Sequence, residues 1–255
     1  MTPNTVQIRT PWLITEQVPN IRARLFCFPY AGGGASVYRL WQQYLPHDIQ
    51  ICALQPPGRE SRISEAPYND VQKLVSAIVP EITAFLDHPF AFFGHSTGAL
   101  VAFELTRALR RARLPLPGTL MVSGSRPPHI PEPHPIHHLP EPEFLDGLRR
   151  FAGTPEELLQ NKEIMALYAP ILRADLALEE TYVHEDETLL NIPVAAVGGD
   201  RDSETPPHIL EEWKSHTSGD FTMKLFTGDH FYLRDGFPEL IAYISGRIAQ
   251  TETVC

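Results

Sequence analysis

The segment Phe93-Gly94-His95-Ser96-Thr97-Gly98 decides how this chain is expected to fold. It places Ser96 in a G-x-S-x-G pattern, in which a strand turns sharply into a helix and lifts a serine hydroxyl out of the sheet. The apolar run at residues 89–93 predicts a buried strand, and residues 99–111 predict a helix. The pattern alone is weak, since glycine and serine are common in loops, but its strand–turn–helix context favours a nucleophile elbow.

Strand-like and helical patterns alternate along the rest of the chain. Further strand-like runs lie at residues 24–28, 49–54, 119–123, 192–197 and 221–226, and helical patterns lie at residues 37–44, 71–86 and 238–249. Pro80 falls inside the second helical pattern and predicts a kink or a break there. The alternation predicts an α/β fold with a mostly parallel sheet covered by helices on both faces.

This rhythm changes at Arg126. Residues 126–143 contain seven prolines and no glycine, which excludes a regular helix or a central strand. Three helical patterns follow, at residues 141–151, 155–160 and 163–182. The simplest organisation is one domain over residues 1–255, with a helical insertion at residues 126–190 that forms a lid over the site.

Composition narrows the class of protein. The chain has 255 residues and a formal net charge of −10, which argues against nucleic-acid binding because that needs a basic face. Cys27 and Cys52 lie in apolar runs and predict buried, reduced thiols. The N-terminal segment has no apolar core of a signal peptide, and no run is long enough for a membrane helix. We therefore expect a soluble, cytoplasmic protein without a membrane partner.

A serine nucleophile requires a base that is itself oriented by an acid, and elbow hydrolases order them as serine, acid, histidine. Of the eleven histidines, His230 is the one that ends a predicted core strand near the C-terminus, so it is the predicted base. The spacing Gly199-x-x-Asp202 favours Asp202 as the acid, and Asp200 stays open as the alternative.

The other histidines have simpler interpretations. His95 precedes the nucleophile and is expected to pack or to hydrogen-bond within the elbow. His208 and His216 lie in polar stretches typical of a surface. The histidines of the segment 129–138 lie among prolines that break any helical face, with no cysteine or carboxylate cluster beside them, so no metal site is predicted.

An oxyanion requires backbone N–H donors. The residue after the nucleophile, Thr97, supplies one, and the glycine-rich loop at residues 29–34 supplies the second, for which Ala31 is the best candidate. This loop is no phosphate loop because no G-x-x-x-x-G-K-[ST] follows it, and no cofactor is expected. Some apolar residues of the insertion are expected to line a channel for an acyl chain.

With these residues the chain resembles, nearly end to end, a type II thioesterase of polyketide and nonribosomal peptide biosynthesis. The resemblance is carried by ordered blocks at residues 28–35 (FPYAGGGA), 55–60 (QPPGRE), 93–96 (FGHS), 102–105 (AFEL), 123–128 (SGSRPP), 172–175 (LRAD) and 228–233 (GDHFYL). One residue departs from the pattern: the family usually has methionine after the nucleophile, where this chain has Thr97.

The resemblance implies an α/β-hydrolase fold with a mobile helical lid. It also implies hydrolysis of aberrant or stalled acyl groups from the phosphopantetheine arm of acyl or peptidyl carrier proteins. The catalytic triad would be Ser96, Asp202 and His230, and Thr97 places the acyl preference in question because its side chain changes the pocket floor.

Two rival functions remain: an esterase or peptidase of the same fold acting on small free substrates, and a carrier-binding module with an idle triad. Carrier proteins are typically acidic, so docking to a chain of charge −10 calls for a local basic patch or apolar contacts. Arg107, Arg110, Arg111 and Arg113 could form such a patch, but a solvated helix end is the preferred interpretation.

Overall fold

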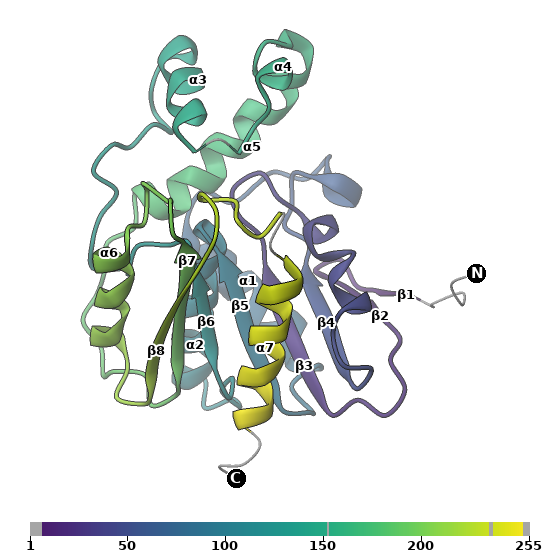
Figure 1. The fold of residues 1–255 in the computed structure, drawn as a ribbon. Helices are drawn as coiled ribbons and strands as arrows, with labels where there is room; N and C mark the ends of the chain where they lie inside the picture. The colour runs from purple at the N-terminus through teal and green to yellow at the C-terminus, as the bar shows by residue number, and fades with distance from the viewer. Residues whose placement is uncertain (1–6, 152, 235–236, 252–255) are drawn as a thin grey trace.

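An eight-stranded sheet forms the centre of the computed structural model, which describes residues 7–151, 153–234 and 237–251 (Figure 1). The strands, in chain order, are β1 (Gln7–Arg9), β2 (Leu13–Glu16), β3 (Ala23–Phe28), β4 (Ile49–Leu54), β5 (Phe90–His95), β6 (Leu120–Ser123), β7 (Val194–Gly199) and β8 (Phe221–Phe226). Their order across the sheet is β1-β2-β4-β3-β5-β6-β7-β8. Strands β3 to β8 are mutually parallel, and β1 and β2 add an antiparallel edge.

Helices cover both faces of this sheet (Figure 1). The α-helices are α1 (Val71–Thr83), α2 (Thr97–Arg111), α3 (Glu141–Arg150), α4 (Glu156–Leu159), α5 (Lys162–Glu180), α6 (Pro207–Glu211) and α7 (Phe237–Thr251). Short 3-10 helices are η1 (Ala35–Tyr38), η2 (Trp41–Gln43), η3 (Glu60–Arg62) and η4 (Glu212–His216). The predicted α/β architecture with a mostly parallel sheet is therefore confirmed.

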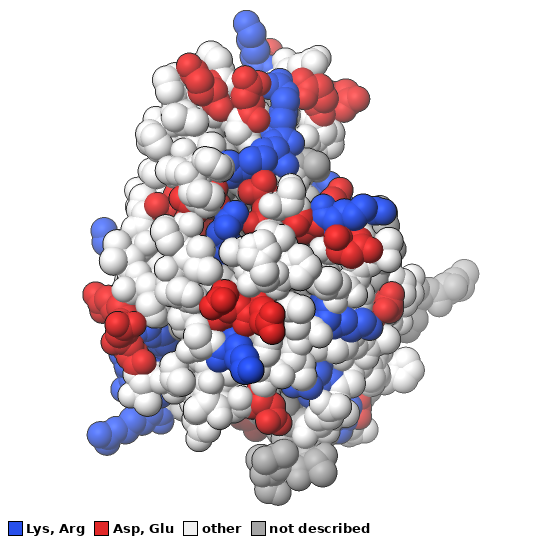
Figure 2. Space-filling model, turned by 60° about the vertical axis from the view of Figure 1, so that its left-hand side comes forward, with Lys and Arg blue, Asp and Glu red and all other residues white. Residues whose placement is uncertain are grey.

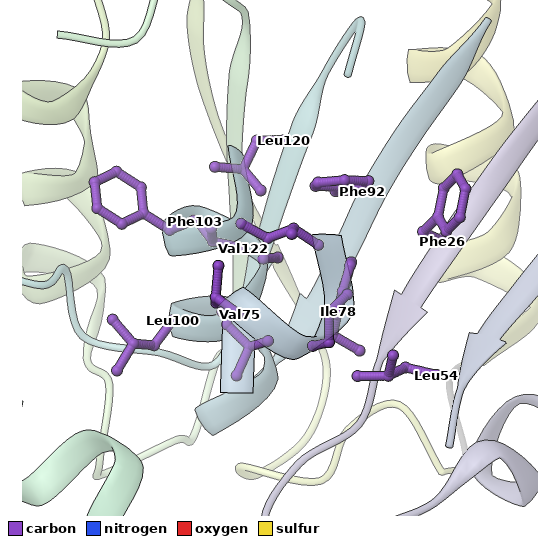
Figure 3. Packing of buried hydrophobic residues seen from close by; sticks show 14 of the residues in the cluster. Phe26, Leu54, Val75, Ile78, Phe92, Leu100, Phe103, Leu120 and Val122 are labelled. Atoms are coloured by element: carbon purple, nitrogen blue, oxygen red, sulfur yellow. The ribbon is translucent and has the colours of Figure 1, made fainter. Parts of the chain in front are cut away.

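One face of the sheet packs against α1, α2, α6 and η4. Phe26, Phe92 and Val122 from three neighbouring strands meet Val75 and Ile78 of α1 there (Figure 3). All residues of β5 and β6 are buried, because helices cover both of their faces. This is why these strands read as continuous apolar runs in the sequence.

The opposite face packs against α7 and the two 3-10 helices η1 and η2. The sequence predicted one helix at residues 37–44, and that prediction is wrong in detail. Tyr38, the last residue of η1, and Trp41, the first residue of η2, pack edge to face with their ring centroids 4.9 Å apart. Both rings contact Phe93 of β5, which anchors this segment under the elbow strand.

Three other details differ from expectation. Helix α1 continues through Pro80 and ends at Thr83, so the expected break does not occur at the proline. The edge strands β1 and β2 were not predicted, and neither were α6 and η4. The prediction for two of the cysteines is confirmed: Cys27 and Cys52 are buried free thiols, and burial raises the pKa of Cys52 to about 12. Cys255 lies outside the described residues.

Helices α3, α4 and α5 all lie between β6 and β7 in the chain, and they stand together above the carboxyl ends of the strands (Figure 1). Their apolar residues form a cluster of their own, which includes Phe144, Leu148, Leu159 and Met165. This insertion supplies a wall above the edge of the sheet at which Ser96 lies.

Candidate active site

Ser96 lies at the sharp turn between β5 and α2, where it has φ 53° and ψ −127°. Such a backbone is strained for a residue with a side chain, and strain of this kind clusters at functional sites. Gly94 and Gly98 make the turn possible: a Cβ at either position would lie 2.2 Å from a backbone oxygen, that of Gly98 or Phe28 respectively. The Ser96 amide donates to the Ser123 carbonyl at 2.8 Å, so β6 holds the turn in place.

His230 and Asp202 are joined by a hydrogen bond of 2.9 Å between Nδ1 of the ring and Oδ2 of the carboxylate. They follow β8 and β7 respectively, and both are buried. The carboxylate also accepts from the Thr205 hydroxyl at 2.5 Å and from the Glu204 amide at 2.9 Å. Burial alone would raise the pKa of Asp202, but these hydrogen bonds, that from His230 first, outweigh it and lower the pKa to about 2.

Asp200, the alternative acid, makes a different contact. Its carboxylate accepts the amide of Gly228 at 2.9 Å, across the turn that follows β8. Gly199 brings the loops after β7 and β8 close together, since a Cβ there would lie 2.3 Å from the Asp229 carbonyl oxygen. The structure thus brings Asp202, and not Asp200, to the histidine ring.

His95 is fully buried beneath this pair, and its hydrogen bond goes to the neighbouring strand β6 instead of staying within the elbow as predicted. Its Nδ1 lies 2.8 Å from the Ser123 hydroxyl, which lies 2.6 Å from the Tyr232 hydroxyl. Burial, and next the neighbouring His230, lower the pKa of His95 well below its usual value, so the ring is neutral. Sequence reasoning missed the roles of Ser123 and Tyr232, although both lie in quoted sequence blocks.

The two residues predicted to supply amides to the oxyanion come from the elbow itself and from the loop after β3. Thr97 begins α2, and Ala31 lies in the loop after β3 and lines the same cavity as Ser96. The neighbouring amides are already engaged: Gly32 donates to Asp175 Oδ2 at 2.7 Å, and Gly33 donates to the Tyr30 carbonyl at 2.8 Å.

A buried ion pair fixes this loop from above. Asp175 of α5 binds both terminal nitrogens of Arg59, with 2.8 Å between Nη2 and Oδ1, and Arg59 also donates to the Gly33 carbonyl at 3.2 Å. The inserted helix α5 therefore holds the backbone that carries Ala31. Arg59 and Asp175 lie in the blocks 55–60 and 172–175 that carry the family resemblance, but the sequence did not reveal that the two residues pair.

A cavity of about 370 Å³ opens beside Ser96 and His230. The insertion contributes its apolar wall, through Leu148 of α3, Leu158 of α4, and Met165, Leu172 and Leu176 of α5. This arrangement agrees with the predicted channel for an acyl chain. A second group of lining residues is charged, which the sequence did not indicate.

The predictions for the remaining histidines are only partly correct. His216, expected at the surface, is buried against Trp213 and Phe103, and its Nε2 lies 2.7 Å from Nδ1 of His129. His137 contacts the Glu180 carboxylate at 2.6 Å. Among the described residues, no three histidine, cysteine or carboxylate side chains are placed to hold a metal ion.

The sequence suggested that the arginines near the end of α2 are solvated, but three of them form ion pairs in the structure. Arg107 is buried and pairs with Glu104 at 2.7 Å and with Glu187 at 2.8 Å. Arg110 and Arg111 also pair with Glu187, at 2.7 and 2.5 Å. These contacts fasten the segment that follows α5 to α2, and they neutralise much of the positive charge.

Together, the strand order, the elbow after β5 and the helices inserted between β6 and β7 define an α/β-hydrolase fold. Residues 23–248 match the Thioesterase domain family. The chain therefore belongs to this family. In the described residues, no helix is long and apolar enough to cross a membrane.

Individual relatives agree over nearly the whole chain. Linear gramicidin dehydrogenase LgrE of Brevibacillus parabrevis is 41% identical over 242 residues, which cover 93% of this chain and 92% of the relative. Thioesterase PikA5 of Streptomyces venezuelae is 38% identical over 234 residues, covering 91% and 83%. The solved structure of the type II thioesterase BorB, from the borrelidin biosynthetic cluster, superimposes with a TM-score of 0.84 at 32% identity, covering 94% and 98%.

Proposed function

We propose that this chain is a type II thioesterase that hydrolyses aberrant or stalled acyl groups from the phosphopantetheine arm of acyl or peptidyl carrier proteins. One observation carries the proposal: Ser96 and His230 line a single cavity with an apolar wall, and Asp202 hydrogen-bonds to the far side of the His230 ring. The similarity to PikA5 and BorB supports the thioester as the substrate class.

In the proposed reaction, Nε2 of His230 accepts the proton of the Ser96 hydroxyl as Oγ attacks the thioester carbonyl. The tetrahedral oxyanion accepts hydrogen bonds from the amides of Ala31 and Thr97. The C–S bond then breaks, and the imidazolium returns its proton to the leaving thiolate. Water, deprotonated by the same ring, attacks the acyl-serine ester and releases the carboxylic acid and free Ser96.

The side chains around His230 suit this cycle. Its Nδ1 contact with Asp202 sets the tautomer in which Nε2 is free to accept a proton. Because the pKa of Asp202 is about 2, the acid remains ionised and stabilises the imidazolium that forms. No cofactor takes part in any of these steps.

The name of LgrE raises a dehydrogenase as a further possibility. The chain contains no G-x-G-x-x-G dinucleotide motif, and the glycine-rich loop after β3 leads into η1 through Gly34 and not into a long helix. We therefore favour hydrolysis.

The proposal is tested with a panel of acyl-loaded carrier proteins, analysed by mass spectrometry after incubation with the wild-type protein or Ser96→Ala. We expect the wild-type protein to release the acid and Ser96→Ala to lose at least about 10³-fold in kcat/KM while still binding the carrier. Aryl esters serve as the comparison substrate. Good cleavage of aryl esters with intact carriers would establish an esterase instead, and unchanged turnover by Ser96→Ala would exclude the serine mechanism.

A further inference from the structure

The cavity beside Ser96 has two unlike walls. Its apolar wall includes Leu158, Met165 and Leu172 of the insertion. Part of the remaining lining is charged: it carries the carboxyl groups of Glu132, Glu179, Glu180 and Glu204 and the guanidinium groups of Arg126 and Arg234. An unsubstituted acyl chain needs only the apolar lining, so the charged side chains require an explanation of their own.

Glu179 is the carboxylate most directly connected to the nucleophile. The Thr97 hydroxyl donates to its Oε2 at 3.3 Å, and Thr97 directly follows Ser96. Glu179 is partly exposed, and it lines the cavity together with Ser96 and His230. A methionine at position 97, usual in the resembling family, could not make this hydrogen bond.

The neighbouring carboxylates already have cationic partners. Glu132 contacts Arg126 at 3.3 Å and Arg150 at 3.1 Å, and Arg150 also contacts Glu204 at 3.2 Å. Among the residues that the structure describes, Glu179 forms no ion pair, and its hydrogen bond comes from a neutral hydroxyl. A carboxylate in such a site is costly unless a cation joins it.

A second observation, in the same cavity, concerns a carboxylate oxygen of Glu180 that lacks a donor. One oxygen of Glu180 accepts from the Ile136 amide, the His137 amide and the His137 ring. The other oxygen, Oε1, is buried and has no partner among the described residues, although Glu180 lines the cavity and its side chain is only 2% exposed. Buried polar atoms normally find a partner, so this oxygen is suited to a donor brought by a ligand.

We propose that Thr97 and Glu179 form a polar subsite that receives an ammonium group on the acyl chain, so that aminoacyl thioesters are preferred to unsubstituted ones. The inference rests on the proposed thioesterase function and specifies its substrate class. An ammonium group close to the carbonyl lies in the same cavity as Glu179, because Glu179 lines that cavity together with Ser96 and His230. Burial, and next the charge of Glu132, raise the pKa of Glu179 to about 7, and the charges of His230 and Arg126 offset this rise only in part.

The test compares alanyl-, lactyl- and propionyl-pantetheine, which differ only in an ammonium, a hydroxyl or a hydrogen at one carbon. We expect wild-type kcat/KM to be highest for the alanyl thioester, by about 10- to 100-fold over propionyl, because a hydrogen bond to a charged group is being made. Glu179→Gln should lower the alanyl-to-propionyl ratio at least about tenfold. Thr97→Met should also lower the alanyl-to-propionyl ratio, because it removes the hydroxyl that contacts Glu179.

Glu163→Gln is the matched control, since Glu163 is exposed in the first turn of the same helix, α5, and should leave the ratio unchanged. An equal or lower rate for alanyl than for propionyl in the wild-type enzyme overturns the subsite. So does a ratio that Glu179→Gln does not change. Failure of the wild-type enzyme to hydrolyse any of the three thioesters, or any acylated carrier, counts against the thioesterase function itself.

Discussion

At the residue scale, two aspartates two positions apart have different roles because the backbone turns between them, so that only Asp202 contacts His230. Asp202 reaches His230 because its own carboxylate is held by the Thr205 hydroxyl and the Glu204 amide. Asp200 instead accepts a hydrogen bond from the Gly228 amide and so stabilises the loop after β8.

We predict that Asp202→Asn lowers kcat by about 10³- to 10⁴-fold, because an amide can hold the ring in the wrong tautomer and cannot stabilise the imidazolium. Asp200→Asn is the matched comparison and should keep kcat within about threefold, since an amide oxygen can still accept from Gly228. Steady-state kinetics on one acylated carrier measures both. A larger loss in Asp200→Asn than in Asp202→Asn would contradict the assignment.

Two glycines illustrate how strongly local space decides a substitution. Gly98→Ala should abolish soluble expression or lower the free energy of unfolding by several kcal/mol, because the new Cβ would lie 2.2 Å from the Phe28 carbonyl oxygen. Gly246→Ala, in α7, meets no atom within 4 Å and should raise that free energy by about 0.5–1 kcal/mol. Urea unfolding measures both free energies. A Gly246→Ala variant less stable than the wild-type protein would contradict the prediction for that position.

At the element scale, the proline-rich segment after β6 is attached to η4 through a pair of histidines. His129 and His216 share a hydrogen bond of 2.7 Å, and His184 packs edge-on against His216. Burial, and next the charges of His129, His184 and Arg107, lower the pKa of His216 to about 3. The folded protein therefore keeps this ring neutral, whereas the unfolded chain protonates it near pH 6.5.

Because only the unfolded state takes up this proton, stability should decrease as the pH falls from about 6.5 toward 3, by at most about 1.4 kcal/mol per pH unit. Urea unfolding at pH 7, 6 and 5 measures this slope. His216→Gln should reduce the slope by up to one proton, and His134→Gln, at an exposed position of the same segment, should not change it. An identical slope in His216→Gln and the wild-type protein would assign the effect to other groups.

The elements also show what sequence could and could not predict. Strands β3 to β7 were predictable because burial on both faces leaves continuous apolar runs. Strand β1 is three residues long and β2 is partly exposed at alternate positions, so neither gives such a run. Ser96 and His230 could be predicted from the G-x-S-x-G pattern and from the order of serine, acid and histidine along the chain. Glu179 could not be predicted, because its position in the cavity depends on the path of α5.

At the scale of the whole molecule, the charge that matters for a partner is the net charge and its distribution over the surface. Acidic and basic side chains are interspersed on the face shown in Figure 2. The net charge is −10, and Glu104 and Glu187 pair with the arginines near the end of α2. An acidic carrier would therefore approach against a repulsive field.

We predict that raising the salt concentration from about 25 to 200 mM lowers KM for carrier-bound substrates, because ions screen this repulsion. KM for the same acyl group on free pantetheine should stay within about twofold and serves as the control. A KM for carriers that rises steeply with salt would instead reveal a basic docking patch.

The insertion leaves the sheet after Ser123, at the carboxyl end of β6, and the chain returns to the opposite edge to enter β7 at Val194, which pairs with Leu120 at the start of β6. Its first part, through α4, contributes Leu148 and Leu158 to the apolar wall, whereas Asp175 and Glu179 lie further along on α5. The first part can therefore be exchanged as a cassette with that of a relative. A chimera with its junctions before α3 and after α4 would take the acyl-chain-length preference of the relative. It would keep the proposed polar subsite and the catalytic residues of this chain.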